Sequence, residues 1–412
     1  MQQAVARQFS LGRPVPPLPE AMPDIIDGFL RAARTHLGLQ VAYVSQFDGN
    51  DAVYQHVDAP GLEALIKPGD RRSLDDVYCR HILAGRLPEL IPDTAAEPVA
   101  QSLPITAAVP IGAHVSVPLR LDGDDVFGMF CCLGPASDPS LNPRDLAMVR
   151  TFADMASAEL KRRRDAEAGV RETRAAVAQM LAEGGPDMVF QPIWRLGDSQ
   201  PAGFEALARF AAVGTAPPRR PDEWFADAAA VGLAEPLELA AVARALAALP
   251  DLPPRAYLTL NVSPATACSV ALTRLLEGQA LDRLVLEITE QQEMVDGDAL
   301  LAALAPLRAA GLRLAVDDAG IGYSGLQKIL EIRPDIIKLD RFFVTGIETD
   351  PSRRALAAAL CEFADGVGAE LVAEGVETEA QLDAVRTLGF AKVQGWLLGR
   401  PMSLAAAADL GR

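Results

Sequence analysis

Two kinds of hydrophobic pattern divide the chain at about residue 160. In the first part, helical and strand periodicities are mixed. The run DIIDGFLRAARTHLG repeats apolar residues every three or four positions, whereas VAYVSQFDG and HVSVPLRLDGDDVFGMFCCLG show the pattern that is typical of strands. Within the longer run, Asp122-Gly123-Asp124 predicts the turn of a hairpin. Residues 21–160 are therefore expected to form an α+β domain.

A long helix is predicted after Asn142-Pro143, which is a favourable helix start. The chain then runs without proline as far as Gly184-Gly185-Pro186, and apolar residues recur every three or four positions along it. We interpret residues 161–185 as a linker helix. It could transmit a change between domains, or pair with its copy in a homodimer.

From residue 186 to 412 the pattern alternates regularly between strands and helices. Alanine- and leucine-rich helical segments separate eight strand-like runs, which are MVFQPIWRL, GFEALARF, YLTLNVS, LVLEITE, RLAVDD, IIKLD, ELVAEGV and KVQGWLLG. This alternation predicts a (β/α)8-type barrel. The expected fold is thus a proline-rich tail at 1–20, an α+β domain, a long helix and a barrel.

Polar side chains stand near the ends of several predicted strands. Because successive strand residues point to opposite faces, Lys338 and Asp340 share one face while Ile337 and Leu339 share the other. Catalytic groups of barrel enzymes come from the carboxyl ends of several strands, so we expect these polar groups to meet at one mouth. The set is Glu205, Arg209, Asn261, Glu287, Asp317, Asp318, Lys338, Asp340, Glu374 and Gln394.

The carboxylates of this set favour metal binding. Two adjacent aspartates at a strand end suit a metal, a proton transfer or only a polar strand end, but so many carboxylates at one mouth repel one another unless cations are bound. Neither histidine nor cysteine contributes, because all four histidines precede residue 187, and oxygen donors favour Mg²⁺ or Mn²⁺ over zinc. The candidate ligands are Glu205, Asn261, Glu287, Asp317, Asp318 and Glu374. Paired aspartates suit two ions.

Charge and cysteine usage narrow the possible partners and compartment. The chain carries 55 acidic and 38 basic residues, a net charge of -17, which argues against a nucleic-acid polymer or an anionic membrane as a partner. The N-terminus lacks the apolar core of a signal peptide, and charges interrupt the other apolar stretches, so we expect a cytoplasmic protein. Five cysteines without CxxC spacing indicate neither a disulfide framework nor a zinc knuckle.

The barrel segment resembles the EAL family of cyclic di-GMP phosphodiesterases. The name-giving signature is Glu205-Ala206-Leu207, and further family blocks follow in order: LNVS, LEITE, DDAGIGYSGL, IKLD, EGVET and QGW. The resemblance covers about 187–405. It implies a variant barrel whose first strand is antiparallel, and hydrolysis of one phosphodiester bond of cyclic di-GMP to give linear pGpG.

The resemblance also implies a role for individual residues. The first metal ion would be held by Glu205, Asn261, Glu287 and Asp317, and the second by Asp317, Asp318 and Glu374. Lys338 and Asp340 would orient the attacking water and offset phosphoryl charge, and with Glu374 they form the expected catalytic group. The expected substrate contacts are Gln191, Leu207, Arg209 and Gln394, and Glu290 and Glu377 would support the site from behind.

One block departs from the family pattern. The loop that usually reads DDFGTGYSSL has Ala319, Ile321 and Gly325 at three altered positions. In the family this loop helps to order the second metal ion and couples to the dimer interface. Both aspartates and the turn glycines Gly320 and Gly322 remain, so we expect metal binding to survive while the rate and the regulation of the loop change.

The first domain resembles a GAF sensory domain, through its α+β pattern and the segment VYCRHILAGRLPELIPDT before the hairpin. This implies a small-molecule ligand that the sequence does not name. Cys79 does not match a bilin attachment site, because Arg80 stands where the chromophore-binding pattern has histidine. Cys131 and Cys132 point to opposite faces of one strand and are interpreted as structural, with redox sensing as the alternative.

Three rival functions fit parts of this pattern. A catalytically weak or inactive EAL domain would act as a cyclic di-GMP receptor, and turnover with Mg²⁺ or Mn²⁺ separates it from the hydrolase. A lyase of enolase type also places lysine and carboxylates at strand ends, but Arg209 and the paired aspartates fit a phosphodiester better. A scaffold role leaves the carboxylates unexplained. No GG(D/E)EF segment occurs, so synthesis of cyclic di-GMP is not predicted.

Overall fold

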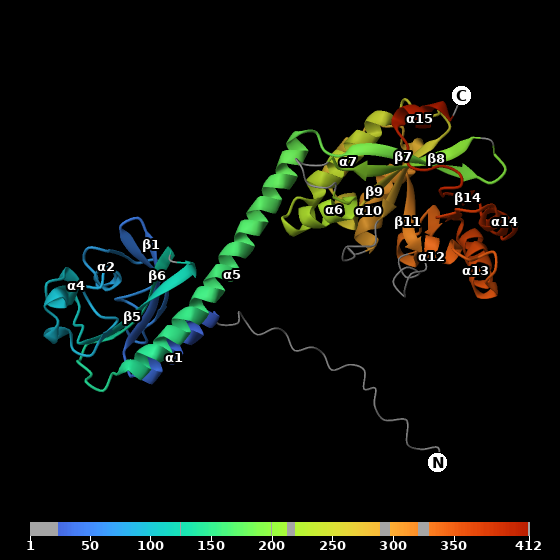
Figure 1. The fold of residues 1–412 in the computed structure, drawn as a ribbon. Helices are drawn as coiled ribbons and strands as arrows, with labels where there is room; N and C mark the ends of the chain where they lie inside the picture. The colour runs from blue at the N-terminus through green and yellow to red at the C-terminus, as the bar shows by residue number, and fades with distance from the viewer. Residues whose placement is uncertain are drawn as a thin grey trace, which may run out of the picture. The chain divides into compact units, whose positions relative to one another are not determined.

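The computed structural model describes residues 24–123, 125–198, 200–211, 219–288, 297–319 and 329–410, without the side chains of Asp318 and Ala319. The predicted tail at 1–20 lies outside these residues. The chain divides into two compact units, Met1–Ala168 and Gly169–Arg412. Figure 1 draws the first unit in blue to green and the second in green to red.

The first unit is built on one six-stranded antiparallel sheet with the strand order β3-β2-β1-β6-β5-β4. The predicted α+β fold is therefore confirmed. Its strands are β1 (Val41–Asp48), β2 (Asp51–Asp58), β3 (Arg71–Ser73), β4 (Leu90–Ile91), β5 (Ala113–Asp122) and β6 (Asp125–Gly134). Its helices are α1 (Ile25–Leu37), α2 (Cys79–Leu83), η1 (Thr94–Ala96), α3 (Pro98–Gln101) and α4 (Pro104–Ala108), followed by the start of α5 (Pro143–Ala182).

Each face of this sheet packs on a different set of helices. One core joins α1 and α5 to the sheet and includes Phe130 and Cys132 of β6. The other core joins α2 to the opposite face and includes Met129 and Cys131 of the same strand. Alternation along β6 therefore sends the two adjacent cysteines into different cores, as predicted.

The helix α5 is continuous over 40 residues, Pro143–Ala182, and passes from the first unit into the second. Val149 is buried in the first unit and Val177 in the second. In the first unit the stripe is covered as far as Leu160, although Met155 is 46% exposed. Beyond it Val170 is 53% exposed, so the predicted stripe is uncovered in the middle of the helix.

The second unit is a closed eight-stranded barrel with the order β10-β11-β12-β13-β14-β7-β8-β9. β7 is antiparallel to both its neighbours, β8 and β14, and the remaining pairs are parallel. This confirms the variant barrel with an antiparallel first strand. The strands are β7 (Asp187–Arg195), β8 (Pro201–Arg209), β9 (Tyr257–Val262), β10 (Leu284–Ile288), β11 (Arg313–Ala319), β12 (Ile336–Leu339), β13 (Glu370–Ala373) and β14 (Lys392–Val393).

Helices follow the strands and cover the barrel from outside (Figure 1). They are α6 (Pro221–Ala230), α7 (Ala234–Ala248), α8 (Pro264–Ala267), α9 (Val270–Leu276), η2 (Leu281–Arg283), α10 (Gly297–Ala309), α12 (Arg341–Val344), α13 (Pro351–Val367), α14 (Glu379–Thr387) and α15 (Leu404–Asp409). Within the described residues, no helix is both long and apolar enough to cross a bilayer.

The prediction that KVQGWLLG forms the eighth strand is correct for its first two residues and wrong for the rest. Only Lys392 and Val393 pair as a strand, and a turn follows. The cause is a change of hydrogen-bond partner: the carbonyl of Gln394 accepts from the backbone N–H of Val376, and Leu397 N–H donates to the Val376 carbonyl. These bonds direct the segment away from the barrel wall.

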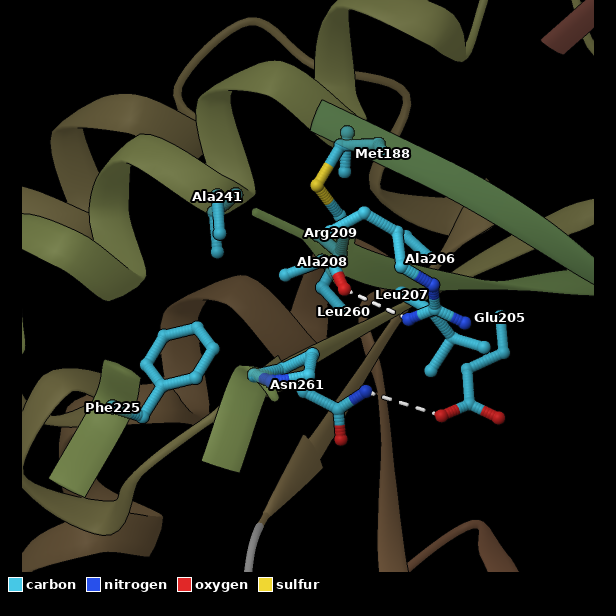
Figure 2. A pocket seen from close by; sticks show the side chains of 13 residues that line it. Met188, Glu205, Ala206, Leu207, Ala208, Arg209, Phe225, Ala241, Leu260 and Asn261 are labelled. Carbon is cyan, nitrogen blue, oxygen red and sulfur yellow. Dashed lines mark hydrogen bonds between the residues drawn. The ribbon is translucent and has the colours of Figure 1, made fainter. Parts of the chain in front are cut away.

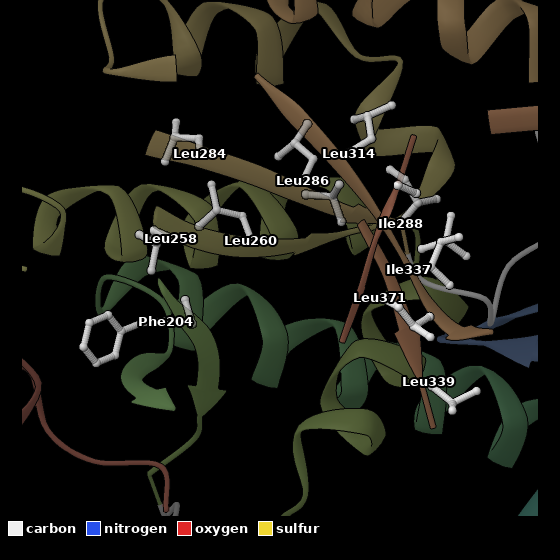
Figure 3. Close-up of a cluster of buried hydrophobic side chains, with 14 of the residues drawn as sticks. Phe204, Leu258, Leu260, Leu284, Leu286, Ile288, Leu314, Ile337, Leu339 and Leu371 are labelled. Carbon is white, nitrogen blue, oxygen red and sulfur yellow. The ribbon is translucent and has the colours of Figure 1, made fainter. Parts of the chain in front are cut away.

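Because side chains alternate along each strand, the apolar residues that pack against the helices face outward, and the polar residues of the site face inward. Outward-facing residues such as Leu258, Leu286 and Ile337 pack against the helices in one large apolar cluster (Figure 3). The inward set forms a small separate cluster of Ile193, Tyr257, Val285, Ala315, Ile336 and Val372. Asn261, Glu287 and Lys338 have the same inward parity nearer the carboxyl ends of their strands, so the fold gathers them inside the mouth.

Candidate active site

The ammonium group of Lys338 lies at the centre of the barrel mouth. Its Nζ is 2.6 Å from Oε1 of Glu374, 2.7 Å from Oε1 of Glu287, 3.3 Å from Oε2 of Glu205 and 3.6 Å from Oδ1 of Asp317. These carboxylates come from β10, β8, β11 and the end of β13. The structure therefore brings together four of the carboxylates that the strand-end pattern singled out.

Two amides complete this cluster. Nε2 of Gln394 donates to Oε2 of Glu205 at 2.7 Å, and Nδ2 of Asn261 donates to Oε1 of the same carboxylate at 3.2 Å. Figure 2 shows the Asn261 side chain turned toward Glu205. Both oxygens of Glu205 thus have amide donors in addition to the lysine.

Burial gives the cluster an unusual charge balance. Burial raises the pKa of Glu287 well above its ordinary range; Lys338 opposes this, and the carboxylates of Asp317, Glu205 and Glu374 add to it. Burial likewise raises the pKa of Glu374 to about 8, against the opposing effect of Lys338. Burial lowers the pKa of Lys338, but the four carboxylates outweigh this and hold it well above its ordinary value. One ammonium is not enough to neutralise four carboxylates in so buried a place.

The donor set fits a hard divalent cation. Every candidate ligand offers carboxylate or amide oxygen, and Oε2 of Glu287 is buried without a hydrogen-bond partner among the described residues. A cation would satisfy this unpartnered oxygen and offset the three other acids that raise the pKa of Glu287. In the described part of the chain no group of three or more His, Cys, Asp or Glu side chains is already arranged around an ion position. The ammonium of Lys338 lies between the acids.

The other predicted site residues lie at the rim or behind it. Asp340 is the N-cap of α12 and accepts from the backbone N–H of Phe342 at 2.7 Å. Oε1 of Glu377 is 3.6 Å from Nη1 of Arg341, and Nε2 of Gln191 donates to the Gly399 carbonyl at 3.2 Å. Gln191, Leu207 and Glu377 line the same cavity as the cluster, whereas Asp340 does not line it.

Three predicted features fall outside what the structure describes. The side chain of Asp318 is not described, although its backbone belongs to β11. Glu290 and the altered loop at 320–328 lie outside the described residues. The predicted second metal ion therefore rests on Asp317 and Glu374 alone among the described side chains.

A cavity of about 230 Å³ opens over the cluster and reveals two residues that sequence reasoning did not single out. Arg341 and Trp396 both line it; Trp396 is 52% exposed, and the guanidinium of Arg400 lies 4.5 Å from its ring centroid. The adjacency of Arg341 to Asp340 and the family block QGW were the available signals. An arginine and an exposed indole suit a phosphate and a base.

Gly375, next to Glu374, allows Arg341 to reach this cavity. Its φ is +66°, and a Cβ at this position would lie 2.6 Å from Cβ of Arg341. Only glycine meets both demands. The sequence block EGVET, which supplies Glu374, thus also supplies the glycine that leaves room for the Arg341 side chain.

A second cavity, of about 280 Å³, adjoins the first between β8 and the helices α6 and α7. Glu205 and Leu207 line both cavities, and Arg209, Phe225 and Asn261 line the second (Figure 2). Arg209 is exposed, and its Nη1 donates to the Ala208 carbonyl at 2.8 Å. The guanidinium therefore lies beside the cluster without contacting it.

A buried glutamate that sequence reasoning missed holds the turn after Asn261. Oε2 of Glu238, on α7, accepts from the backbone N–H of Ser263 at 2.8 Å and from its Oγ at 2.9 Å. These two hydrogen bonds to a buried carboxylate fix the end of β9. In sequence, Glu238 is one acid within an alanine- and leucine-rich helix, which gives no sign of this role.

Comparison with known proteins matches both units to families. The EAL domain model matches residues 174–401, more than half of the chain, and the GAF domain model matches residues 22–160. The cyclic di-GMP phosphodiesterase NbdA of Pseudomonas aeruginosa is 30% identical over 346 residues, which cover 81% of this chain and 42% of NbdA. An uncharacterized signaling protein of Caulobacter vibrioides is 30% identical over 316 residues, covering 71% of this chain and 38% of that protein.

Solved structures of EAL proteins also match this chain. The PaMucR phosphodiesterase in complex with c-di-GMP matches 57% of this chain and 99% of its own, with 27% identity and a TM-score of 0.51. The EAL enzyme Bd1971 matches 90% of this chain at 17% identity and a TM-score of 0.56, which shows likeness of fold. The chain spans less than half the length of the relatives NbdA and the Caulobacter protein. By its barrel, its ordered strand-end blocks and the family match over most of the second unit, this chain belongs to the EAL family and carries a GAF domain before its EAL domain.

Proposed function

We propose that this chain is a metal-dependent phosphodiesterase that hydrolyses cyclic di-GMP to linear pGpG. The observation that carries the proposal is the cluster of Glu205, Glu287, Asp317 and Glu374 around Lys338 inside the barrel mouth. The names of the relatives support the same substrate, since NbdA is a cyclic di-GMP phosphodiesterase and the PaMucR phosphodiesterase was solved with c-di-GMP.

Divalent cations, Mg²⁺ or Mn²⁺, belong to this proposal. Glu205, Asn261, Glu287 and Asp317 would hold one ion, and Asp317, Asp318 and Glu374 a second. Bound there, the ions would neutralise the acids, polarise the phosphoryl oxygens and acidify water. The support is the all-oxygen donor set and the unpartnered Oε2 of Glu287.

The protein side chains contribute binding and charge stabilisation. Lys338 orients the attacking water and offsets negative charge that develops on the phosphoryl oxygens. Asp340, expected to share this role, caps α12 and does not line the cavity. Arg209 holds a phosphate from the adjoining cavity, while Gln191, Leu207 and Gln394 contact the nucleotide. Glu377 positions Arg341, and Glu290 supports the ligands from behind.

Turnover is the direct test. Purified full chain with cyclic di-GMP and Mg²⁺ or Mn²⁺ is expected to give pGpG on chromatography, and both excess EDTA and the double variant Asp317→Ala, Asp318→Ala are expected to abolish it. Saturable binding without any product would instead assign the chain as a cyclic di-GMP receptor.

We also propose that the GAF unit binds a small molecule and regulates the barrel. A cavity of about 380 Å³ in this unit supports the first part. It is lined by aliphatic side chains together with Tyr43, Tyr54, Tyr78, His114 and Arg72, a lining that suits a largely apolar ligand with one anionic or polar group. A homodimer that pairs through the exposed face of α5 is part of the same proposal, and light scattering of the purified chain tests it.

A further inference from the structure

The 380 Å³ cavity of the GAF unit has a lining that restricts the chemistry of its ligand. Five of the six strands, β1, β2, β3, β5 and β6, contribute to the lining, together with the segment between β2 and β3 and with α4. Many of these residues belong to the core on the α2 side of the sheet. An engineered cavity of about 150 Å³ holds one benzene molecule, so the GAF cavity has room for a ligand of about twice that size.

The buried part of the lining carries four aromatic rings, which are Tyr43, Tyr54, Tyr78 and His114. The ring centroids of Tyr43 and Tyr54 are 4.6 Å apart, and those of Tyr78 and His114 are 4.9 Å apart in an edge-on arrangement. The hydroxyl of Tyr78 is hydrogen-bonded to Oγ1 of Thr106 at 2.7 Å, which holds that ring in place. Because aromatic rings attract one another in edge-on and offset arrangements, this lining favours an aromatic ligand.

The exposed part of the lining includes an arginine without an acidic partner. Arg72 is exposed, its Nη1 donates to the Arg71 carbonyl at 3.4 Å, and within the described residues it makes no ion pair. Its neighbour Arg71, by contrast, pairs with Asp48 at 2.7 Å and with Asp51 at 3.4 Å. Leu65, another residue of the lining, is 72% exposed. A free guanidinium beside apolar surface suits a carboxylate, which it binds through two parallel hydrogen bonds.

One polar atom of the buried lining also lacks a partner. His114 is 2% exposed, and its Nδ1 has no hydrogen-bond partner among the described residues. A hydroxyl on the ligand would supply the missing hydrogen bond with either tautomer of the imidazole, because a hydroxyl both donates and accepts. Apart from the three tyrosines, the rest of the lining is aliphatic, so it offers few partners for the many polar atoms of a nucleotide.

The two polar positions lie on strands that are far apart in the sheet. Arg72 is on β3 and His114 is on β5, and β2, β1 and β6 lie between them. Strands are spaced by about 4.8 Å, so roughly 19 Å separates the backbones of β3 and β5, and the side chains reach in from both sides. A ligand that meets both residues is therefore elongated, with its two polar groups at opposite ends.

We propose that the GAF cavity binds an elongated aromatic monocarboxylate with a hydroxyl at the far end of its ring. The carboxylate lies on Arg72, the ring packs among the tyrosines, and the hydroxyl meets Nδ1 of His114. This inference rests on the proposal that the GAF unit binds a small molecule, and it names the class of that molecule.

The probe is 4-hydroxycinnamate, which has a carboxylate and a hydroxyl at opposite ends of one aromatic body. Calorimetric titration of the purified full chain is expected to show saturable binding at one site per chain. The uncharged 4-hydroxycinnamamide as ligand, or Arg72→Met as variant, is expected to weaken binding about tenfold or more. Arg71→Met is the matched control and is expected to keep the wild-type affinity, because Arg71 does not line the cavity.

Cinnamate tests the second polar position, because it lacks the hydroxyl. It is expected to bind the wild type about two- to tenfold more weakly than 4-hydroxycinnamate, and the two ligands are expected to bind His114→Phe equally. The wild-type comparison stands on its own if His114→Phe fails to fold. Equal affinity of the wild type for the two ligands would overturn the role of His114.

Three other results would overturn the ligand class: equal affinity for the acid and its amide, no binding of 4-hydroxycinnamate, or tighter binding of decanoate, an aliphatic acid. Binding of decanoate in place of the aromatic acid would leave the small-molecule proposal for the GAF unit intact. Absence of binding by all four compounds would count against both. The titration contains no cyclic di-GMP, so none of these results bears on the phosphodiesterase proposal.

Discussion

At the scale of single residues, the barrel mouth is defined by a buried lysine among acids. Burying an ammonium and several carboxylates is costly unless each charge is paired. The single ammonium of Lys338 neutralises only part of the negative charge of the cluster. Strand parity was sufficient to predict Glu205, Asn261, Glu287 and Lys338, because a period of two fixes which side chains point inward. It could not predict that Lys338 would occupy the centre, or that Arg341 and Trp396 would line the cavity, because these depend on side-chain conformation and on loop paths.

Replacing Lys338 by methionine tests this balance. Without the ammonium, two buried and two partly buried carboxylates lose their shared partner. Lys338→Met is therefore expected to lower the free energy of unfolding of the metal-free protein by about 3 to 5 kcal/mol. Mg²⁺ is expected to restore part of that loss, because it takes over the neutralisation. Urea unfolding with and without Mg²⁺ measures both effects.

Lys392→Met is the matched control. Lys392 is also fully buried, and its Nζ lies 2.5 Å from Oε2 of Glu370. Its removal is expected to destabilise the protein without any response to Mg²⁺, because Glu370 is at the amino end of β13 and Glu374 follows the carboxyl end. An equal Mg²⁺ response in the two variants would contradict the proposed cation site.

Gly375 and Gly389 provide a second comparison between residues. Both have positive φ, +66° and +91°, but only at Gly375 would a Cβ meet another residue, Arg341. Gly375→Ala is expected to cost about 1 kcal/mol more stability than Gly389→Ala and to raise the KM for cyclic di-GMP, since Arg341 must move. Steady-state kinetics and thermal unfolding of both variants check this, and indistinguishable KM values would remove Arg341 from the site.

At the scale of elements, local sequence fixed helices and strands where capping and period agreed. Asp24 caps α1 by accepting from Ile26 N–H, and Gly38 ends the same helix with φ +65°. The eighth strand was overestimated because KVQGWLLG is largely apolar, and an apolar run does not reveal a change of hydrogen-bond partner.

The cap of α1 predicts a pH dependence for the GAF unit. The hydrogen bond from Arg163 lowers the pKa of Asp24 from its ordinary 3.8 to about 2, although burial opposes this. A lowered folded-state pKa contributes stability that is complete above pH 4 and is lost as the pH falls toward 2. Asp24→Asn keeps the cap but removes the charge, so it is expected to be less stable than wild type at pH 7.

The stability difference between wild type and Asp24→Asn is expected to shrink below pH 4. Chemical unfolding at pH 7, 4 and 3 follows it. A difference that stays constant across this range would mean that the Arg163 ion pair contributes nothing to folding.

At the scale of the whole molecule, two units with separate cores share one helix. The compact units divide at Ala168 and Gly169, whereas the sequence pattern suggested a linker helix over 161–185. Residues near the middle of α5 are exposed, so the helix is held at its ends. The continuous helical pattern in the sequence predicted the length of α5 well. It could not indicate where along α5 the contacts with each unit end.

The shared helix predicts a dependence of the barrel on the GAF unit. Deletion of residues 1–160 is expected to change the activity, the oligomeric state or the ligand response of the protein, since α5 would lose its first anchored end. Turnover and light scattering of the truncated and full chains compare them. If all three properties stayed the same, α5 would be a passive linker.

The most direct test of the central claim is the turnover of cyclic di-GMP by Glu287→Gln beside wild type and the control Glu362→Gln, which changes an exposed acid on α13. Glu287 is fully buried and has an unpartnered oxygen, so its neutral isostere should fold as well as wild type. The account predicts a loss of about a hundredfold or more in kcat for Glu287→Gln, with Glu362→Gln unchanged. Wild-type turnover by Glu287→Gln would contradict the assignment of the barrel-mouth cluster as the catalytic site.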